Sequence, residues 1–279
     1  MRLGVLDRKF EIPYNFDWNY CDILEGCNLI NDSIRYIYIA PFREDYTTII
    51  RADLYGAKKL TREEYVKHIL KIKQHFQGKM QLLLQNKKSI MPIEMLKWYI
   101  NLGFTHFCCG NPMQAKMIKE YDPQLTVIGS IVLHVTREEL CNNEYYKQYF
   151  DEFVLDFSFG RKLQKIKELP RNKKYLILCN AYCHTNCDGD HHWQVKDEFE
   201  EIVCPGRLWE TKDFSQSVLI RPMDLKYFDP WISTYKIQDR SWTTWEIVSD
   251  LILYQTDYSI YPGIEYDQFL YDTVYPVFL

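Results

Sequence analysis

The chain has 279 residues, of which 47% are hydrophobic and 26% are charged, and its formal net charge is −4. A chain of this length buries roughly three quarters of its unfolded surface, so its bulk stability requires neither disulfides nor a metal. The composition excludes long disordered stretches. The basic residues form no stripe that would follow the phosphates of duplex nucleic acid, which we therefore do not expect as a partner.

The location of the protein is predicted from its apolar runs and its cysteines. The apolar runs are too short to cross a membrane, and residues 1–20 lack the order of a secretion signal. We therefore expect a cytoplasmic protein with no membrane contact. Its 9 cysteines are an odd number, which favours reduced thiols or metal ligands over a disulfide framework.

Apolar segments of strand length alternate with helix-periodic segments along most of the chain. The predicted strands are residues 2–6, 36–40, 80–85, 106–109, 126–132, 153–157, 175–179, 217–220 and 234–237. Several are apolar on both faces, as a parallel sheet covered by helices requires. Residues 8–33 are predicted to be irregular.

Helix signals lie between these strands. Thr61 with Glu64 and Thr136 with Glu139 have the spacing of capping boxes, and a further helix is predicted from Thr243. Residues 92–102 and 161–169 also have helical patterns, the first closed by Gly103. His68 is expected on the polar, solvated side of the helix after Thr61.

The alternating pattern predicts an α/β protein with a (β/α)8 TIM-like barrel, either regular or irregular. We expect this barrel to span residues 1–255, with an insertion at about 188–216. Residues 256–279 would form an aromatic extension that packs on the barrel or at a partner interface. The active site of such a barrel lies at the C-terminal ends of its strands, where Cys109, favoured slightly over Cys108, is one of the polar or thiol groups expected.

The most distinctive feature is a cluster of thiols and imidazoles. Cys179, Cys183 and Cys187 are followed by His191 and His192, and Cys204 comes soon after. Thiolates favour zinc, copper(I) or iron-sulfur clusters. Cys183, Cys187 and Cys204 are the preferred ligands, while Cys179 is a reserve because it ends a strand and its side chain can point into the core.

Two sequence blocks resemble one known family. The segment 176–192, with Asn180, Cys183, Cys187 and His192, resembles the VNxxCxxxCxxRxxH segment of the collagenase-like peptidase superfamily. The block Ile220-Arg-Pro-Met-Asp-Leu225, followed by Lys236-Ile-x-x-Arg240, is similar to the IRPEDL and FKIxGR run of the same group. That superfamily includes oxygen-independent iron-sulfur hydroxylases of ubiquinone synthesis and of tRNA and ribosomal RNA.

The resemblance implies an iron-sulfur cluster, [4Fe-4S] being the usual form. Zinc, which thiolates also bind, is the alternative metal. It assigns cluster ligands to Cys183, Cys187 and Cys204. Four cysteines are usual, so either Cys179, Cys109, Cys108 or His192 completes the shell, or one iron is open to substrate. The arginine of the family segment is absent here, which leaves the substrate class open.

Three basic residues are candidates for binding an anion. The planar guanidinium of Arg221 suits a carboxylate of the substrate or of a small oxygen donor such as prephenate, unless an ion pair with Asp224 or Asp239 occupies it. Lys236 and Arg240 flank the next loop and are weaker candidates.

The resemblance implies three functions. The first is an iron-sulfur enzyme that modifies a small-molecule, peptide or RNA substrate without molecular oxygen, by hydroxylation. The second is a peptidase or peptide-modifying enzyme that uses the same barrel mouth. The third is a non-catalytic subunit that forms a hetero- or homodimer with a related barrel protein, with Trp231, Trp242 and Trp245 at the interface.

Overall fold

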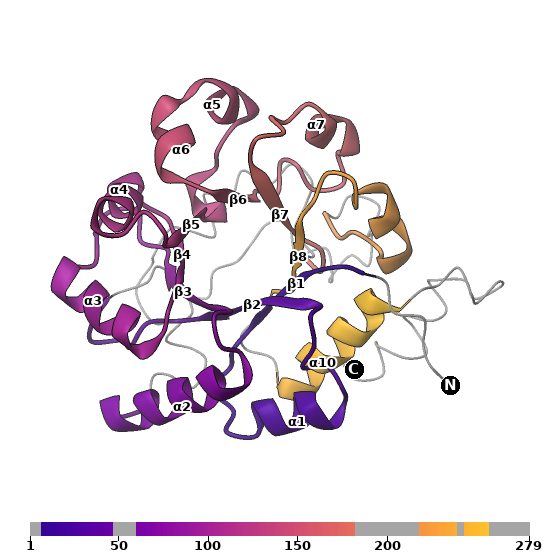
Figure 1. The fold of residues 1–279 in the computed structure, drawn as a ribbon. Coiled ribbons are helices and arrows are strands. Elements are labelled where there is room, and N and C mark those ends of the chain that lie inside the picture. Colours follow the sequence, from indigo (N-terminus) through magenta and orange to yellow (C-terminus); the bar gives the residue numbers. More distant parts are fainter. Residues whose placement is uncertain (1–6, 47–59, 182–217, 239–242, 257–279) are drawn as a thin grey trace, which may run out of the picture.

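The fold is a closed barrel of eight parallel strands surrounded by helices, and the chain order of the strands is also their order around the barrel (Figure 1). The structure is a computed structural model that describes residues 7–46, 60–181, 218–238 and 243–256. The strands are β1 (Phe10–Pro13), β2 (Ile34–Ile39), β3 (Met80–Leu84), β4 (His106–Cys109), β5 (Thr126–Gly129), β6 (Glu152–Leu155), β7 (Lys174–Leu178) and β8 (Thr234–Lys236). The predicted (β/α)8 barrel is confirmed.

Two strand predictions need correction or lie outside the structure. β1 pairs in parallel with both β2 and β8, so the first barrel strand lies within the segment that we predicted to be irregular. Residues 2–6 lie outside the described residues. Residues 218–220 form no strand, although the Ile220 amide donates to the Cys179 carbonyl at 3.0 Å. β7 instead pairs directly with β8.

The helices follow the strands as expected for this fold. They are α1 (Tyr20–Gly26), α2 (Arg62–His75), α3 (Ile93–Leu102), α4 (Pro112–Tyr121), α5 (Arg137–Asn142), α6 (Glu144–Tyr149), α7 (Leu163–Lys167) and α10 (Thr244–Gln255), with 3-10 turns η3 (Ile131–Leu133) and η5 (Pro222–Tyr227). In the part of the chain that the structure describes, no helix combines the length and apolarity needed to cross a bilayer.

Local sequence signals set most helix starts. Complete capping boxes begin α2, α5 and α10 at Thr61, Thr136 and Thr243. The segment after Thr136 divides into two helices because Asn143 caps a new one, accepting from the amides of Tyr145 and Tyr146. Gly103 ends α3 with φ 111°, a backbone conformation that favours glycine.

Alternate residues of each strand face either the barrel interior or the surrounding helices. The interior cluster includes Tyr36, Tyr38, Leu83 and Leu176, whereas Ile37 and Leu82 belong to the larger core under the helices. Cys108 belongs to the interior cluster and Cys109 to the core under the helices. Our slight preference for Cys109 as the inward-facing thiol was therefore wrong.

Candidate functional site at the barrel mouth

Polar side chains gather at the C-terminal ends of the strands. Gln85 follows β3 and donates to the Ser130 hydroxyl after β5 at 3.1 Å. Asn180 follows β7, donates to Asp250 of α10 at 2.7 Å and accepts from the backbone amide of Gln238 at 2.8 Å. The predicted clustering of polar groups at this end of the barrel is therefore present among the described residues.

Lys236 lies inside the barrel rather than at its rim. It is buried, forms an ion pair with the fully buried Glu11 of β1, and its ammonium lies 3.8 Å from the centre of the Tyr38 ring. The Tyr38 hydroxyl donates to the Ile237 carbonyl at 2.9 Å, next to Lys236 in the chain. These contacts fix the orientation of the Lys236 side chain beneath the barrel mouth.

Arg221 lies where the described chain resumes after the thiol-bearing segment. Its guanidinium holds both carboxylate oxygens of Asp224, with Nε–Oδ2 at 2.6 Å and Nη2–Oδ1 at 3.1 Å. The side chain of Arg221 is 42% exposed, so solvent reaches the pair. The Arg221–Asp224 ion pair, which the sequence offered as the alternative to anion binding by Arg221, is therefore formed. An incoming anion would have to share the guanidinium with Asp224.

The structure describes only Cys179 of the proposed ligands in and around the thiol cluster. Its thiol is fully buried, contacts the Lys236 carbonyl at 3.5 Å, and belongs to the core under the helices. Burial raises its pKa well above the ordinary value, which disfavours the thiolate that a metal requires. Cys183, Cys187, Cys204, His192 and Arg240 lie outside the described residues.

Sequence reasoning missed a histidine–aspartate pair at the mouth. His134 Nδ1 lies 3.5 Å from Asp156 Oδ2, and the two residues follow β5 and β6. Asp156 also accepts from the Ser158 amide at 2.8 Å, and its pKa is lowered by hydrogen bonds from His134 and Ser158 despite its burial. His134 has φ 49°, a left-handed conformation that is uncommon for residues other than glycine. Its position after an apolar strand was the only sequence signal.

His68 also differs from the prediction. It is buried, and its Nδ1 is hydrogen-bonded to the Tyr14 hydroxyl at 2.5 Å. The aromatic residues Phe16 and Trp18 pack against its ring. The segment between β1 and α1 therefore covers the side of α2 that the helical pattern alone had indicated to be solvated.

Among the described residues, no group of three or more His, Cys, Asp or Glu side chains could hold a metal ion. The described part of the mouth contains the ionisable side chains of Arg221 and Asp224 and of His134 and Asp156. A metal site at this end would need at least one ligand from outside the described residues, for example from the segment between Ala181 and Val218.

Comparison with known proteins finds similarity in fold only. No family model matches the chain, and no curated protein matches it. The solved structure of the U32 peptidase Mk0906 is 11% identical, with a TM-score of 0.46 over 86% of this chain and 95% of that one. A structure from Aquifex aeolicus VF5 is 8% identical, with a TM-score of 0.49 over 89% of this chain and 87% of that one. At these values the similarities support no inference about function.

Proposed function

We propose that this chain is an enzyme with an iron-sulfur cluster at the C-terminal mouth of its barrel. Cys183, Cys187 and Cys204 are the proposed cluster ligands. The proposed reaction is a modification without molecular oxygen, with hydroxylation of a small-molecule, peptide or RNA substrate as the preferred case. The thiol motif of the sequence suggests this chemistry, and one feature of the barrel supports its location.

The supporting observation is where the thiol-bearing segment leaves and rejoins the described barrel. Ala181, on one side, and Val218, on the other, are both buried in the interior cluster that closes the top of the barrel. Cys183 follows Ala181 by two residues in the sequence. Both ends of the segment are thus anchored at the mouth, where the active sites of such barrels lie.

The geometry bears on the fourth ligand. Cys179 and Cys109 face the helices rather than the mouth, so neither fits a cluster there. Cys108 faces the interior, but it belongs to no group of three or more His, Cys, Asp or Glu side chains among the described residues. We therefore favour His192, or an iron with one open position, over a fourth cysteine. A bound cluster would supply electron transfer or a Lewis-acidic iron.

The described residues contribute substrate handling in this proposal. Arg221, oriented by Asp224, would bind a carboxylate near the mouth, since a guanidinium has donors for more than one acceptor. Lys236 would contribute positive charge below the mouth, although its ion pair with Glu11 offsets much of this charge.

Anaerobic purification tests the proposal. We expect a brown protein with a broad absorption shoulder near ~400 nm and about four iron atoms per chain. Cys183→Ala should lose the colour and most of the iron. Cys179→Ala and Cys141→Ala should keep both, because the first thiol faces the helices and the second lies on α5.

Three results would contradict the proposal. These are a colourless protein with stoichiometric zinc, equal loss of iron in all three cysteine variants, or peptide hydrolysis that persists after the iron is removed. The last result would favour the peptidase alternative.

A further inference from the structure

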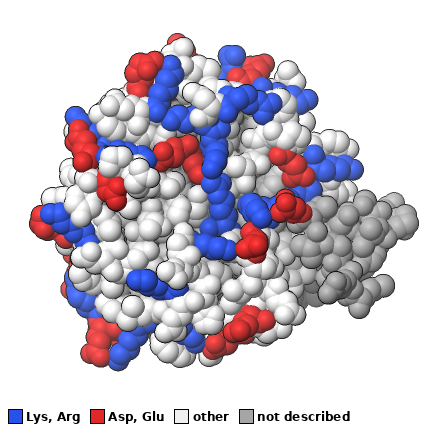
Figure 2. Space-filling view, viewed as in Figure 1, with Lys and Arg blue, Asp and Glu red and all other residues white. Residues whose placement is uncertain are grey.

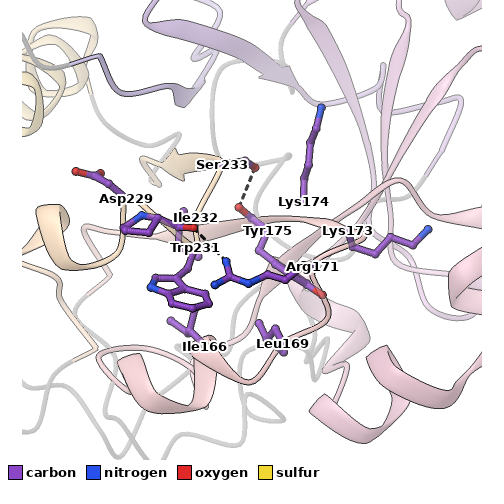
Figure 3. A pocket seen from close by; sticks show the side chains of 11 residues that line it. Ile166, Leu169, Arg171, Lys173, Lys174, Tyr175, Asp229, Trp231, Ile232 and Ser233 are labelled. Carbon is purple, nitrogen blue, oxygen red and sulfur yellow. Dashed lines mark hydrogen bonds between the residues drawn. The ribbon is translucent and has the colours of Figure 1, made fainter.

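A groove lies at the opposite end of the barrel from the proposed active site. It has a volume of about 280 Å³ and lies between α7 and the residues around η5, at the starts of β7 and β8 (Figure 3). Its lining includes Trp231, Tyr175, Ile166 and Leu169 on the apolar side, and Arg171, Lys173, Lys174 and Asp229 among the charged groups. The groove thus joins an apolar floor to a mostly basic rim.

The positive charge of this rim is only partly neutralised. Asp229 accepts hydrogen bonds from Nε and Nη2 of Arg8, at 2.9 and 3.0 Å, and this ion pair offsets the negative charge of Asp229. Arg171 stacks on the Trp231 ring, with its guanidinium carbon 3.1 Å from the ring centre. The Lys174 side chain is 63% exposed, and its ammonium lies 4.0 Å from a carboxylate oxygen of Glu152. Arg171 and Lys174 are therefore accessible to carboxylates of a ligand.

The rim charges are spread out rather than focused on one point. Figure 3 shows Lys174, Lys173 and Arg171 pointing in different directions around the groove. Figure 2 shows Lys and Arg side chains in a band across the same view of the barrel, near β7 and β8. Separated cations around an apolar floor suit an extended acidic segment with aromatic side chains better than a single small anion.

The chain itself contains such a segment after α10. Residues 257–279 contain no Lys or Arg, and their acidic residues are Asp257, Glu265, Asp267 and Asp272. The same segment has aromatic residues at Tyr258, Tyr261, Tyr266, Phe269, Tyr271, Tyr275 and Phe278. Its composition is complementary to the groove in both charge and apolarity.

Topology brings the start of this segment to the end of the barrel that bears the groove. α10 runs back from the C-terminal mouth, and Gln255 at its end donates to the Ser33 hydroxyl, just before β2, at 2.6 Å. Arg35, at the start of β2, donates to the hydroxyl of Ser233, which lines the groove, at 3.3 Å. An extended chain of 23 residues, 257 to 279, reaches up to about 80 Å, which is ample to cross this end of the barrel.

We propose that residues 257–279 dock in the groove between α7 and η5 of the same chain, with carboxylates against Arg171 and Lys174 and an aromatic side chain beside Trp231. Docking would cover the N-terminal end of the barrel and leave the opposite mouth open. The proposal does not depend on the iron-sulfur cluster.

Hydrogen exchange of the full chain, followed by mass spectrometry, tests this docking. In the wild type we expect the amides of residues 257–279 to exchange at least about tenfold more slowly than in an unprotected peptide. The Arg171→Glu/Lys174→Glu variant should lose this protection, and Asp267→Lys/Asp272→Lys should lose it as well. Combining the four substitutions should restore much of it, because the charges are again complementary.

The matched control is Lys167→Glu, which reverses an exposed charge on α7 outside the groove and should leave the protection unchanged. Exchange of β3 and β4 in the same samples reports whether each barrel is intact. The proposal is overturned if the wild-type segment exchanges without protection, or if its protection survives the groove reversal. Protection that grows with protein concentration would instead indicate docking between two copies and would also overturn it.

Discussion

At the scale of single residues, the barrel interior contains charged side chains that are shielded from water and must be neutralised by one another. Glu11 and Lys236 form a buried ion pair between β1 and β8, the strands whose pairing closes the barrel. Removing one partner of such a pair leaves an uncompensated buried charge, whereas replacing both with apolar groups can be nearly neutral. The pair therefore affects both stability and the proposed use of Lys236 near the active site.

We expect Lys236→Met to lower the free energy of unfolding by about 3–5 kcal/mol, because Glu11 then loses its buried partner. The double variant Glu11→Leu/Lys236→Met should recover most of that loss. Chemical denaturation of the three proteins checks this. Equal stabilities of Lys236→Met and the double variant would show that the loss in Lys236→Met does not come from an uncompensated Glu11 charge.

His106 should make stability depend on pH. Burial, reinforced by nearby Arg35, lowers its pKa to about 4, whereas an unfolded histidine titrates near ~6.5. Between these values the unfolded chain binds a proton that the folded chain does not, so stability falls as the pH falls through this window. The slope from this residue is at most about 1.4 kcal/mol per pH unit.

Replacing His106 by Gln should flatten the stability curve between pH 6.5 and 4 relative to the wild type. Denaturation at several pH values, analysed as the difference between the two proteins, separates this contribution from those of the carboxylates. Parallel curves for the two proteins would contradict the assignment.

At the scale of elements, the predictions succeeded where signals are local. The capping boxes at Thr61 and Thr136 and the glycine after α3 depend on residues a few positions apart, and all lie where the sequence placed them. β1 was missed because it is only 4 residues long and ends in proline. Residues 218–220 have a strand-like apolar pattern because all three are buried, Val218 in the interior cluster and Ile220 in the core under the helices, and not because they pair within the barrel.

The candidate site could be predicted only in part, because partners depend on the fold. The sequence identified Arg221 and Lys236 as candidates. The ion pair of Arg221 with Asp224 was one of two pairs that the sequence allowed, the other being with Asp239. The ion pair of Lys236 with Glu11 was not predicted. Glu11 is 225 positions away from Lys236 in the chain. The pair His134 and Asp156 forms only when β5 and β6 end side by side.

Helix α10 is attached to the loop after β7 through the Asn180–Asp250 hydrogen bond. Burial raises the pKa of Asp250 to about 7 from an ordinary value of 3.8. The folded protein therefore holds a proton that the unfolded chain releases, and this contribution to stability is lost as the pH rises from about 4 to about 7.

Asp250→Asn should stabilise the protein at pH 8, by on the order of 1–3 kcal/mol, because it removes a buried charge and keeps an acceptor for Asn180. The advantage should shrink near pH 4. Thermal denaturation at the two pH values measures it. A variant that is less stable at pH 8 would show that the carboxylate is required for docking of α10.

At the scale of the whole molecule, the two ends of the barrel differ in character. At the N-terminal end Arg35 bonds Glu152 at 2.5 Å and the Thr234 hydroxyl at 2.6 Å, and the Tyr36 hydroxyl donates to Glu152 at 3.2 Å. This network connects β2, β6 and β8 across the interior. The C-terminal mouth instead has separate polar pairs above the apolar interior cluster. Substitutions at the mouth should therefore disturb the barrel less than substitutions in the network at the N-terminal end.

The proposed metal site should therefore be separable from the fold. All eight strands of the barrel, and the described part of the core under the helices, consist of residues outside the thiol-bearing segment 182–217. In zinc fingers, by contrast, the metal supplies the folding free energy itself. A chain of 279 residues already buries enough surface to fold without metal.

Anaerobic removal of iron with a chelator should thus remove the colour while the far-ultraviolet circular dichroism stays unchanged. Cooperative thermal unfolding should remain, with a midpoint lowered only by the lost binding energy of the cluster, because ligands stabilise a folded state by mass action. The Cys183→Ala protein should behave like the chelated wild type. Loss of the cooperative transition after iron removal would show that the thiol-bearing segment and its metal are part of the folding core. The barrel would then not fold independently of the proposed metal site.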